Sequence, residues 1–178
     1  MTTPPEPPPL KGLLGDEHEH LLIDGVPHAK ALGLKLVEMS RDNAIVKLPY
    51  DPRFVGNPET GVIHGGAVTS LLDNVSGLAV FAAMEELTSI ATLDLRIDYM
   101  RAATPGKDIL AHAHCYKVTR TIAFVRGVAY EDGPDDPIAT CTGAFMLGSN
   151  AGRQPGANTT GQGALGDQGA MGDQEGSK

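Results

Sequence analysis

Aromatic side chains are scarce in this 178-residue chain, which has no tryptophan, four tyrosines and four phenylalanines. A core must therefore be built mainly from Leu, Ile, Val and Ala, and the hydrophobic fraction of 41% is adequate for one core. Cysteine is also rare, since only Cys115 and Cys141 occur. Two thiols do not make a disulfide framework, so the sequence favours a reducing cytoplasm, with a single bridge between them as the alternative.

Positive charge is in deficit: 14 Lys and Arg face 22 Asp and Glu, the formal net charge is −8 and the pI is about 5.1. This balance argues against a dominant nucleic-acid surface, which needs a basic face. No apolar run reaches the roughly 18 residues of a membrane span. The N-terminus is Pro-rich and acidic instead of basic and then apolar, so we expect no signal peptide and a cytoplasmic location.

Composition divides the chain into three parts. We predict a Pro-rich, disordered leader over residues 1–15, one folded domain over 16–148 and a disordered Gly-rich tail over 149–178. The tail has almost no large apolar side chains, so it cannot bury enough surface to offset the entropy lost on ordering.

Apolar spacing and turn residues predict an α+β fold. A long helix over 66–86 is expected to be buried on more than one side, because it is apolar over most of its circumference. An antiparallel sheet with a single buried helix must curve to cover that helix. We predict short helices over 16–24 and 27–31, a hairpin of strands over 34–39 and 44–48, a loop over 50–63, and a four-strand meander over 89–101, 108–118, 121–131 and 137–147.

The most informative motif is His64-Gly65-Gly66 followed, within the long helix, by Asp73. Almost every neighbour of Asp73 is apolar or small, and an ionised carboxylate in such surroundings is costly unless it has partners or a task. Helical spacing places Thr69, Asp73 and Ser76 on one narrow polar stripe. The alternative is a structural acid that caps nearby N–H groups or pairs with an arginine.

The runs HGGAVTSLLDNVSGLAV and TLDLRIDYMRAATPGKDI resemble the PaaI-like acyl-CoA thioesterases of the hotdog fold, and the similarity extends from about Pro27 to about Leu147. The resemblance implies a curved antiparallel sheet wrapped around one central helix. It also implies homodimers or homotetramers whose active sites lie at the subunit interface. One subunit would supply His64, Gly65 and the preceding loop, and the other would supply Asp73.

The resemblance assigns roles to individual residues. Asp73 would attack the thioester carbonyl or activate a water, and the Gly65 N–H would hold the carbonyl oxygen. Asn57 approximates a loop Asn that orients the water or the carbonyl, although the loop from Asn57 to His64 is one residue longer than in some members. Thr92 falls where relatives place a hydroxyl near the reacting centre. An ordinary turn residue and an ordinary strand residue are the alternatives for Asn57 and Thr92.

These residue types suit thioester hydrolysis. The leaving group is good, so the reaction needs a base or nucleophile and an oxyanion stabiliser, but no metal and no cofactor beyond the CoA of the substrate. Helix-start N–H groups are unpaired and carry the positive end of the dipole, and glycine lets a ligand approach them. His64 is expected to fix the loop or to donate toward the carbonyl.

Substrate contacts are assigned to Gly66 and Ser76 and to two arginines. Because CoA carries several phosphates, a local basic patch is expected on an otherwise acidic protein. Arg101 and Arg120 lie at a strand end and in a turn, where phosphates could reach them, and solvated surface charges are the alternative. Two His-x-His pairs, His18/His20 and His112/His114, have no further ligand at motif spacing, so no metal site is predicted.

Two other functions compete with a thioesterase that acts on a small, medium-chain or aromatic acyl-CoA. A hotdog enoyl-CoA hydratase would need an Asp five residues before the histidine, where this chain has Glu59. A non-catalytic module that binds acyl-CoA or an aromatic ligand would not need a buried acid. Release of free thiol from acyl-CoA esters distinguishes the thioesterase from both.

Overall fold

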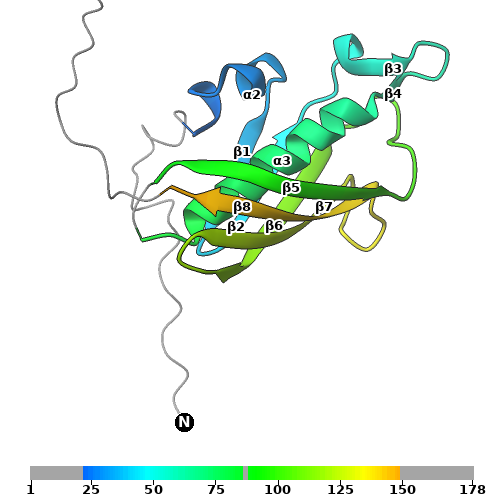
Figure 1. Cartoon of the computed structure of the whole chain (residues 1–178). Helices are drawn as coiled ribbons and strands as arrows, with labels where there is room; N and C mark the ends of the chain where they lie inside the picture. The colour runs from blue at the N-terminus through cyan, green and yellow to red at the C-terminus, as the bar shows by residue number, and fades with distance from the viewer. Residues whose placement is uncertain (1–21, 86–87, 149–178) are drawn as a thin grey trace, which may run out of the picture.

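A six-stranded antiparallel sheet curves around one long helix in the computed structural model of the protein (Figure 1), which describes residues 22–85 and 88–148. The elements are α2 (Pro27–Ala31), β1 (Lys35–Ser40), β2 (Asn43–Leu48), the 3-10 helix η2 (Pro52–Phe54), β3 (Val55–Asn57), β4 (Val62–Ile63), α3 (Gly65–Ala82), β5 (Ile90–Tyr99), β6 (Ile109–Val118), β7 (Ile122–Tyr130) and β8 (Ala139–Leu147). The predicted leader and tail, and residues 16–21 of the first predicted helix, lie outside the described residues.

Strand order in the sheet is β1-β2-β6-β7-β8-β5, which corrects one prediction. β6, β7 and β8 form a meander as expected, but β5 pairs with β8 at the edge, and β2 pairs with β6. Alternation identifies a strand without identifying its partner. The charged outer residues of β5, Asp94, Arg96 and Asp98, are typical of an edge strand.

The core lies between α3 and the inner face of the sheet. On the helix, Leu71, Leu72 and Val75 are fully buried. The sheet presents small side chains that let the helix approach closely: Ala111, Ala113, Ala123, Ala129 and Ala139, all without exposed surface. Bulges in β1, β5 and β6 bend the sheet around the helix. The predicted hotdog architecture is thus confirmed.

The length and apolar composition of α3 would also allow it to cross a membrane, but most of the helix is buried against the sheet, as in the core of a globular domain. Both cysteines are free thiols, so the alternative of a Cys115–Cys141 bridge is wrong. The predicted loop over 50–63 contains η2 and a two-stranded β3–β4 hairpin. Its turn uses Gly61 at φ 74°, a conformation that favours glycine.

Arg101 forms an ion-pair cluster at the end of β5, and its contact with CoA phosphates stays a prediction. Its guanidinium contacts Glu131 at 3.1 Å and Asp136 at 3.0 Å. The Glu131 side chain is only 4% exposed and also accepts hydrogen bonds from the Thr104 N–H and hydroxyl. Burial favours a higher pKa for Glu131, but the Thr104 and Arg101 donors outweigh it and hold the pKa below its usual range.

We expect Glu131→Gln to lower the free energy of unfolding by about 2 kcal/mol, because it leaves a half-buried arginine without its carboxylate. Since the native pKa of Glu131 lies below the unfolded value of about 4.3, its contribution is present above that pH and is lost as the pH falls through the native pKa. Urea unfolding between pH 3 and 7 measures both effects. Asp132→Asn, which removes an exposed pair with Lys107, is the control and should change stability by less than about 1 kcal/mol.

Candidate active site

His64 caps the N-terminus of α3. Its backbone is extended, at φ −63° and ψ 135°, and its Nδ1 accepts a hydrogen bond from the Gly66 N–H at 2.9 Å. The His64 carbonyl accepts from the Ala67 N–H, and the His64 N–H donates to the Phe54 carbonyl at 2.8 Å. The histidine therefore joins the start of the helix to the preceding η2 segment.

Two glycines enclose the His64 side chain. A Cβ on Gly66 would lie 2.9 Å from His64 Nδ1, and a Cβ on Gly56 would lie 3.0 Å from the His64 Cα and 3.1 Å from its Cβ. Real Cβ atoms essentially never come within 2.9 Å, and contacts of 3.0–3.1 Å are tight, so a side chain at 66 would displace the imidazole and one at 56 would crowd it. The cap therefore needs glycine at position 66 for packing. This is a separate role from the substrate contact predicted for Gly66.

The cap also determines which imidazole nitrogen carries the proton. Because the Gly66 N–H donates to Nδ1, the neutral ring carries its hydrogen on Nε2. Among the described residues, neither the His64 Nε2–H nor the Gly65 N–H has a hydrogen-bond partner. The helix start therefore presents two candidate donors beside the positive end of the helix dipole.

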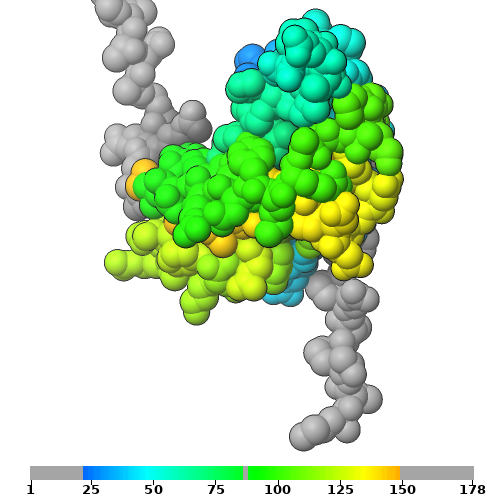
Figure 2. Space-filling view, turned by 90° about the vertical axis from the view of Figure 1, so that its right-hand side faces the viewer, coloured from blue at the N-terminus to red at the C-terminus, as the bar shows by residue number. Residues whose placement is uncertain are grey.

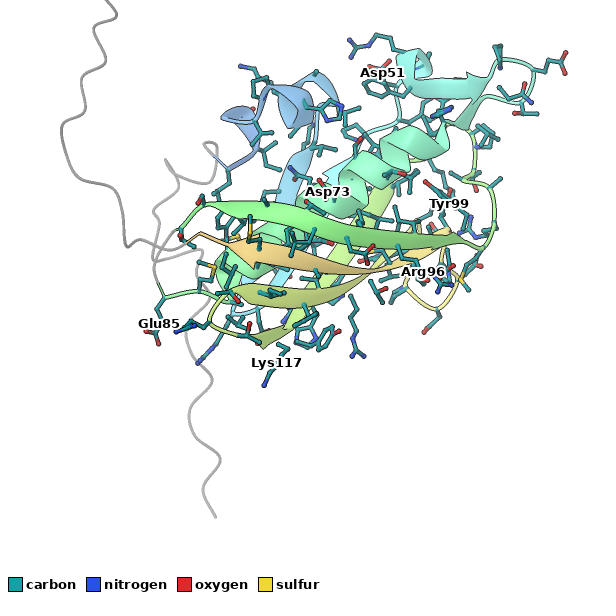
Figure 3. All side chains as sticks on the ribbon, in the orientation of Figure 1. Asp51, Asp73, Glu85, Arg96, Tyr99 and Lys117 are labelled. Carbon is teal, nitrogen blue, oxygen red and sulfur yellow. The ribbon has the colours of Figure 1, made fainter. Side chains whose placement is uncertain are left out.

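Asp73 lies near the middle of α3, half-buried, on the side that faces β5 (Figure 3). Its Oδ1 accepts a hydrogen bond from the Thr92 hydroxyl at 2.9 Å, so the structure brings two predicted site residues together. Within the described part of the chain, Oδ2 has no partner. The carboxylate is therefore oriented by one donor but not saturated, which leaves an oxygen for chemistry.

Helix geometry separates these two parts of the site within one chain. The rise of about 1.5 Å per residue places Gly65 and Asp73 about 12 Å apart along the axis of α3. Reacting groups must approach to about 3–3.5 Å, so the Gly65 N–H and the Asp73 carboxylate of one chain cannot act on the same carbonyl.

Two neighbouring cavities follow α3 from the helix start to Asp73. They have volumes of about 410 and 380 Å³ and share His28, Leu32 and Ser70 in their walls. The first reaches His64 and Gly66, and the second reaches Asp73, Thr69 and Asn74. The Asn74 Oδ1 is buried and has no hydrogen-bond partner among the described residues. α2 supplies part of the walls, which the sequence had not indicated.

Asn57 and Ser76 do not line either of the two cavities along α3. Asn57 is exposed, and its Oδ1 accepts from the Glu59 N–H at 3.0 Å, so within the chain it closes the β3–β4 turn. Ser76 lies on the predicted polar stripe but has no exposed surface, and its Oγ is 3.9 Å from Cys141 Sγ in the core. Ser76 thus lies in the core of the chain, because spacing reveals the helix face but not its burial depth, and its substrate contact stays a prediction.

Arg120 is exposed in the turn between β6 and β7, without an ion-pair partner among the described residues. Arg120 and Arg101 lie at opposite ends of β8. Thr121, next to Arg120, accepts a hydrogen bond from Leu147, the last residue of β8, whereas the Arg101 N–H donates to Ile138, just before the first residue of β8. The strand between them has nine residues, or about 30 Å at 3.4 Å per residue. The two arginines therefore do not form one patch within a chain.

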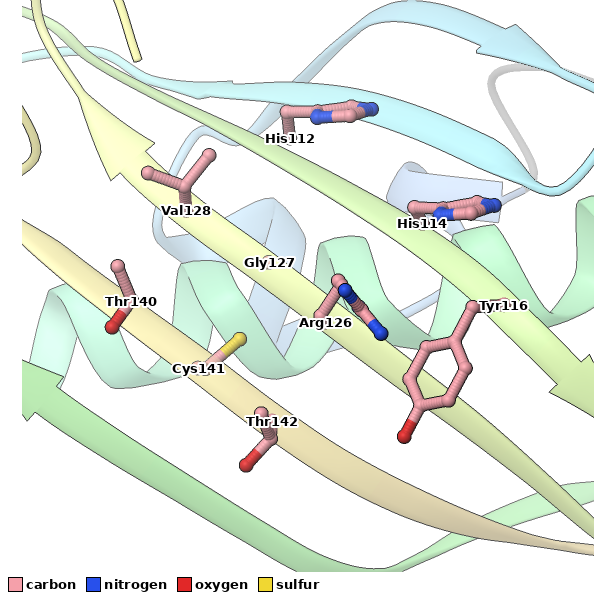
Figure 4. A pocket seen from close by; sticks show the side chains of 9 residues that line it. All are labelled: His112, His114, Tyr116, Arg126, Gly127, Val128, Thr140, Cys141 and Thr142. Carbon is pink, nitrogen blue, oxygen red and sulfur yellow. The ribbon is translucent and has the colours of Figure 1, made fainter. Parts of the chain in front are cut away.

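The outer face of the sheet holds a separate cavity of about 490 Å³ (Figure 4). His112 and His114 line it, with His112 Nε2 2.9 Å from the Asn43 Oδ1 and His114 Nε2 3.6 Å from Asp42. Across the described ranges, no group of three or more His, Cys, Asp or Glu side chains is placed to hold a metal ion. His18 and His20 lie outside those ranges.

Tyr99 is a contact that sequence reasoning missed. Its hydroxyl donates to the Gly65 carbonyl at 2.6 Å and lies 2.9 Å from the Thr69 Oγ1. Strict alternation would put Thr92 and Tyr99 on opposite faces of β5, because they are seven residues apart. The bulge between Thr92 and Asp94 shifts the register, so both face the helix. No local signal in the sequence marks this bulge.

The chain is similar to a protein family, to a named thioesterase and to solved structures. The Thioesterase superfamily model matches residues 60–138. The medium/long-chain acyl-CoA thioesterase YigI of Escherichia coli K12 is 26% identical over 141 residues, which cover 72% of this chain and 90% of YigI. A crystal structure of a Pseudomonas aeruginosa protein is 42% identical, with a TM-score of 0.67 over 73% of this chain and 96% of that one. A mutant form of the phenylacetic acid degradation protein PaaI from Thermus thermophilus is 26% identical, with a TM-score of 0.60 over 68% of this chain and 98% of that one.

The two glycines Gly66 and Gly77 of α3 should respond oppositely to alanine. At Gly77 a Cβ meets only an ordinary contact, 3.4 Å from Ile90 Cδ1, so Gly77→Ala should add about 0.5–1 kcal/mol through helix propensity. At Gly66 the same change displaces the His64 ring, and losing the cap should cost about 1 kcal/mol. Thermal unfolding compares them, and an equal gain in Tm for both variants would refute the enclosed cap.

Proposed function

The chain belongs to the thioesterase superfamily with the hotdog fold and is a thioester hydrolase, and we propose that it releases CoA from acyl-CoA esters with Asp73 as nucleophile or general base. The observation that carries this proposal is the half-buried Asp73 carboxylate, held by Thr92 and open at Oδ2 beside a cavity. A non-catalytic binding module would have no need for such a group.

Two routes are compatible with this geometry. As a nucleophile, Asp73 forms a bond to the carbonyl carbon, the C–S bond breaks, and water then hydrolyses the anhydride that results. As a general base, Asp73 takes a proton from water while the water oxygen adds to the same carbon, and the thiolate then leaves. The Thr92 hydroxyl orients the carboxylate in both routes.

The oxyanion site is proposed at the helix start. The Gly65 N–H has no partner among the described residues, and the His64 Nε2 carries a hydrogen because Nδ1 accepts from the Gly66 N–H. Donors that are fixed before the reaction stabilise the developing negative charge without reorganisation, and the helix dipole adds to this effect.

A homodimer, or a tetramer built from such dimers, is proposed because one chain holds the two halves about 12 Å apart. A second copy supplies the missing half, with the Asp73 of one subunit facing the Gly65 of the other. β5 supports an interface here because it is an edge strand with exposed apolar side chains. The exposed fractions are 53% for Leu93, 51% for Tyr99 and 62% for Met100, which directly follows the strand. Figure 2 shows β5, in bright green, uncovered across one face.

The acyl group is proposed to enter the cavity beside Asp73, where Ala29, Leu32 and Leu95 supply apolar walls. Similarity to a medium/long-chain acyl-CoA thioesterase supports an aliphatic acyl chain as the first substrate to test, with aromatic acyl groups as the next. Arg120 remains the candidate for the CoA phosphates. No cofactor is needed, and the free thiols of Cys115 and Cys141 support a cytoplasmic location.

Asp73→Asn should reduce kcat for acyl-CoA hydrolysis by at least about 10²-fold, because the amide neither attacks the carbonyl nor accepts a proton. The side chain keeps its volume, so the Tm should change little. Thiol release from a panel of C4 to C16 and phenylacetyl CoA esters measures the loss.

Asp132→Asn is the matched control. Asp132 lies exposed in the loop between β7 and β8 rather than on β5, and it pairs with Lys107, so the kcat of this variant should match that of the wild type. If Asp73→Asn keeps wild-type activity on its best substrate, Asp73 is not the catalytic acid. If the wild type releases no thiol from any ester but binds the panel, the chain is a binding module.

Mixing two defective variants tests the shared site. Asp73→Asn and His64→Ala each damage a different half, so a mixed dimer contains one intact site when the halves come from different subunits. Random reassociation should then restore about one quarter of the wild-type activity. If both halves act within one chain, every site keeps a defect and mixing restores nothing.

A further inference from the structure

Tyr99 joins the end of β5 to the first turn of α3. Its hydroxyl donates to the Gly65 carbonyl at 2.6 Å, which leaves the Thr69 hydroxyl, 2.9 Å away, to donate to the tyrosine oxygen. The Thr69 contact thereby orients the Tyr99 hydrogen toward Gly65. A Cβ on Gly65 would lie 3.3 Å from the Tyr99 oxygen, so glycine at this position makes room for the ring.

Gly65 needs such anchors because its backbone is flexible. Glycine has more backbone freedom than other residues, and at a helix start the N–H groups have no partners within the helix. Here the peptide unit after Gly65 is held at both ends: its carbonyl by Tyr99 and its N–H, that of Gly66, by His64. The unit before Gly65 is held through the His64 carbonyl, which accepts from Ala67. Together these bonds determine the direction of the free Gly65 N–H.

We propose that Tyr99 is a positioning residue for the hydrolysis, which keeps the Gly65 N–H aimed at the carbonyl oxygen of the thioester. The proposal rests on the function proposed above and adds a residue that does not touch the reacting atoms. Thr69 belongs to the same device, because it sets the orientation of the tyrosine hydroxyl. β5 thus contributes at both ends, since Thr92 holds the acid and Tyr99 holds the donor.

Loss of the Tyr99 hydroxyl is expected to lower kcat. Losing one oxyanion donor outright typically costs 10²–10³ in kcat, so loosening it should cost less, roughly tenfold. Ground-state binding depends on the cavity walls, so KM should stay within about twofold of wild type. A residue that only stabilised the fold would change neither kcat nor KM of the protein that remains folded.

The test compares Tyr99→Phe with Tyr116→Phe in the full chain. Both changes keep the ring and remove one hydroxyl, but Tyr116 lies on the outer face, where no hydrogen bond of its hydroxyl is present among the described residues. Acyl-CoA kinetics give kcat and KM, size-exclusion chromatography reports the oligomeric state, and amide hydrogen exchange by NMR reports on the Gly66 and Ala67 N–H groups, which both bond to His64. Thr69→Val provides a second variant that leaves the tyrosine in place.

Tyr99→Phe should lower kcat roughly tenfold at similar KM and speed exchange of the hydrogen-bonded Gly66 and Ala67 N–H groups while the middle of α3 stays protected; Thr69→Val should do the same to a smaller extent. Tyr116→Phe should match wild type. The proposal is overturned if kcat of Tyr99→Phe stays within twofold of wild type, or if its loss comes with unchanged exchange at both amides. A wild-type chain that hydrolyses no ester defeats the proposed function instead, and the exchange data then still decide whether Tyr99 anchors the helix start.

Discussion

The hydrogen bond from the Gly66 N–H to His64 Nδ1 is the contact on which the rest of the site depends. It starts α3 at a defined residue, fixes the imidazole tautomer and leaves the Gly65 N–H and the His64 Nε2–H without described partners. All three depend on the position of the ring, which a Cβ on Gly66 would displace, since it would lie 2.9 Å from His64 Nδ1. The two glycines of the motif therefore have different tasks, since Gly66 accommodates His64 and Gly65 accommodates Tyr99.

β5 links this helix start to the acid. Its bulge between Thr92 and Asp94 brings Thr92 and Tyr99 to the same face although an odd number of residues separates them. One strand therefore orients the Asp73 carboxylate at one end and the Gly65 peptide at the other. The same strand is the edge of the sheet, so a device that organises both halves of the site also lies where a second copy would pair.

Sequence patterns predicted what depends on local periodicity. They predicted α3 and the six strands of the large sheet. The family resemblance also placed the Thr92 hydroxyl near the reacting centre, and this hydroxyl donates to Asp73. Sequence patterns failed where position depends on distant chain segments. The partner of β5 depends on which strands face α3, the depth of Ser76 depends on Cys141 across the core, and Arg101 is engaged by acids from another loop. The Tyr99 contact was missed because strand alternation gives the face of a side chain but not its partner, and the bulge that brings Thr92 to the same face leaves no local signature.

The spacing of the motif has a consequence for assembly. A helix that begins at Gly65 and carries its acid at Asp73 separates donor and base by about 12 Å, whatever the side chains around them do. Under the proposed function, catalysis by this pair needs two chains, and a two-fold axis that places one acid opposite one helix start would create the second site by symmetry. In such a protein the association of subunits and the assembly of the active site are one event, so substitutions on the exposed edge of β5 should affect activity even where they touch no substrate.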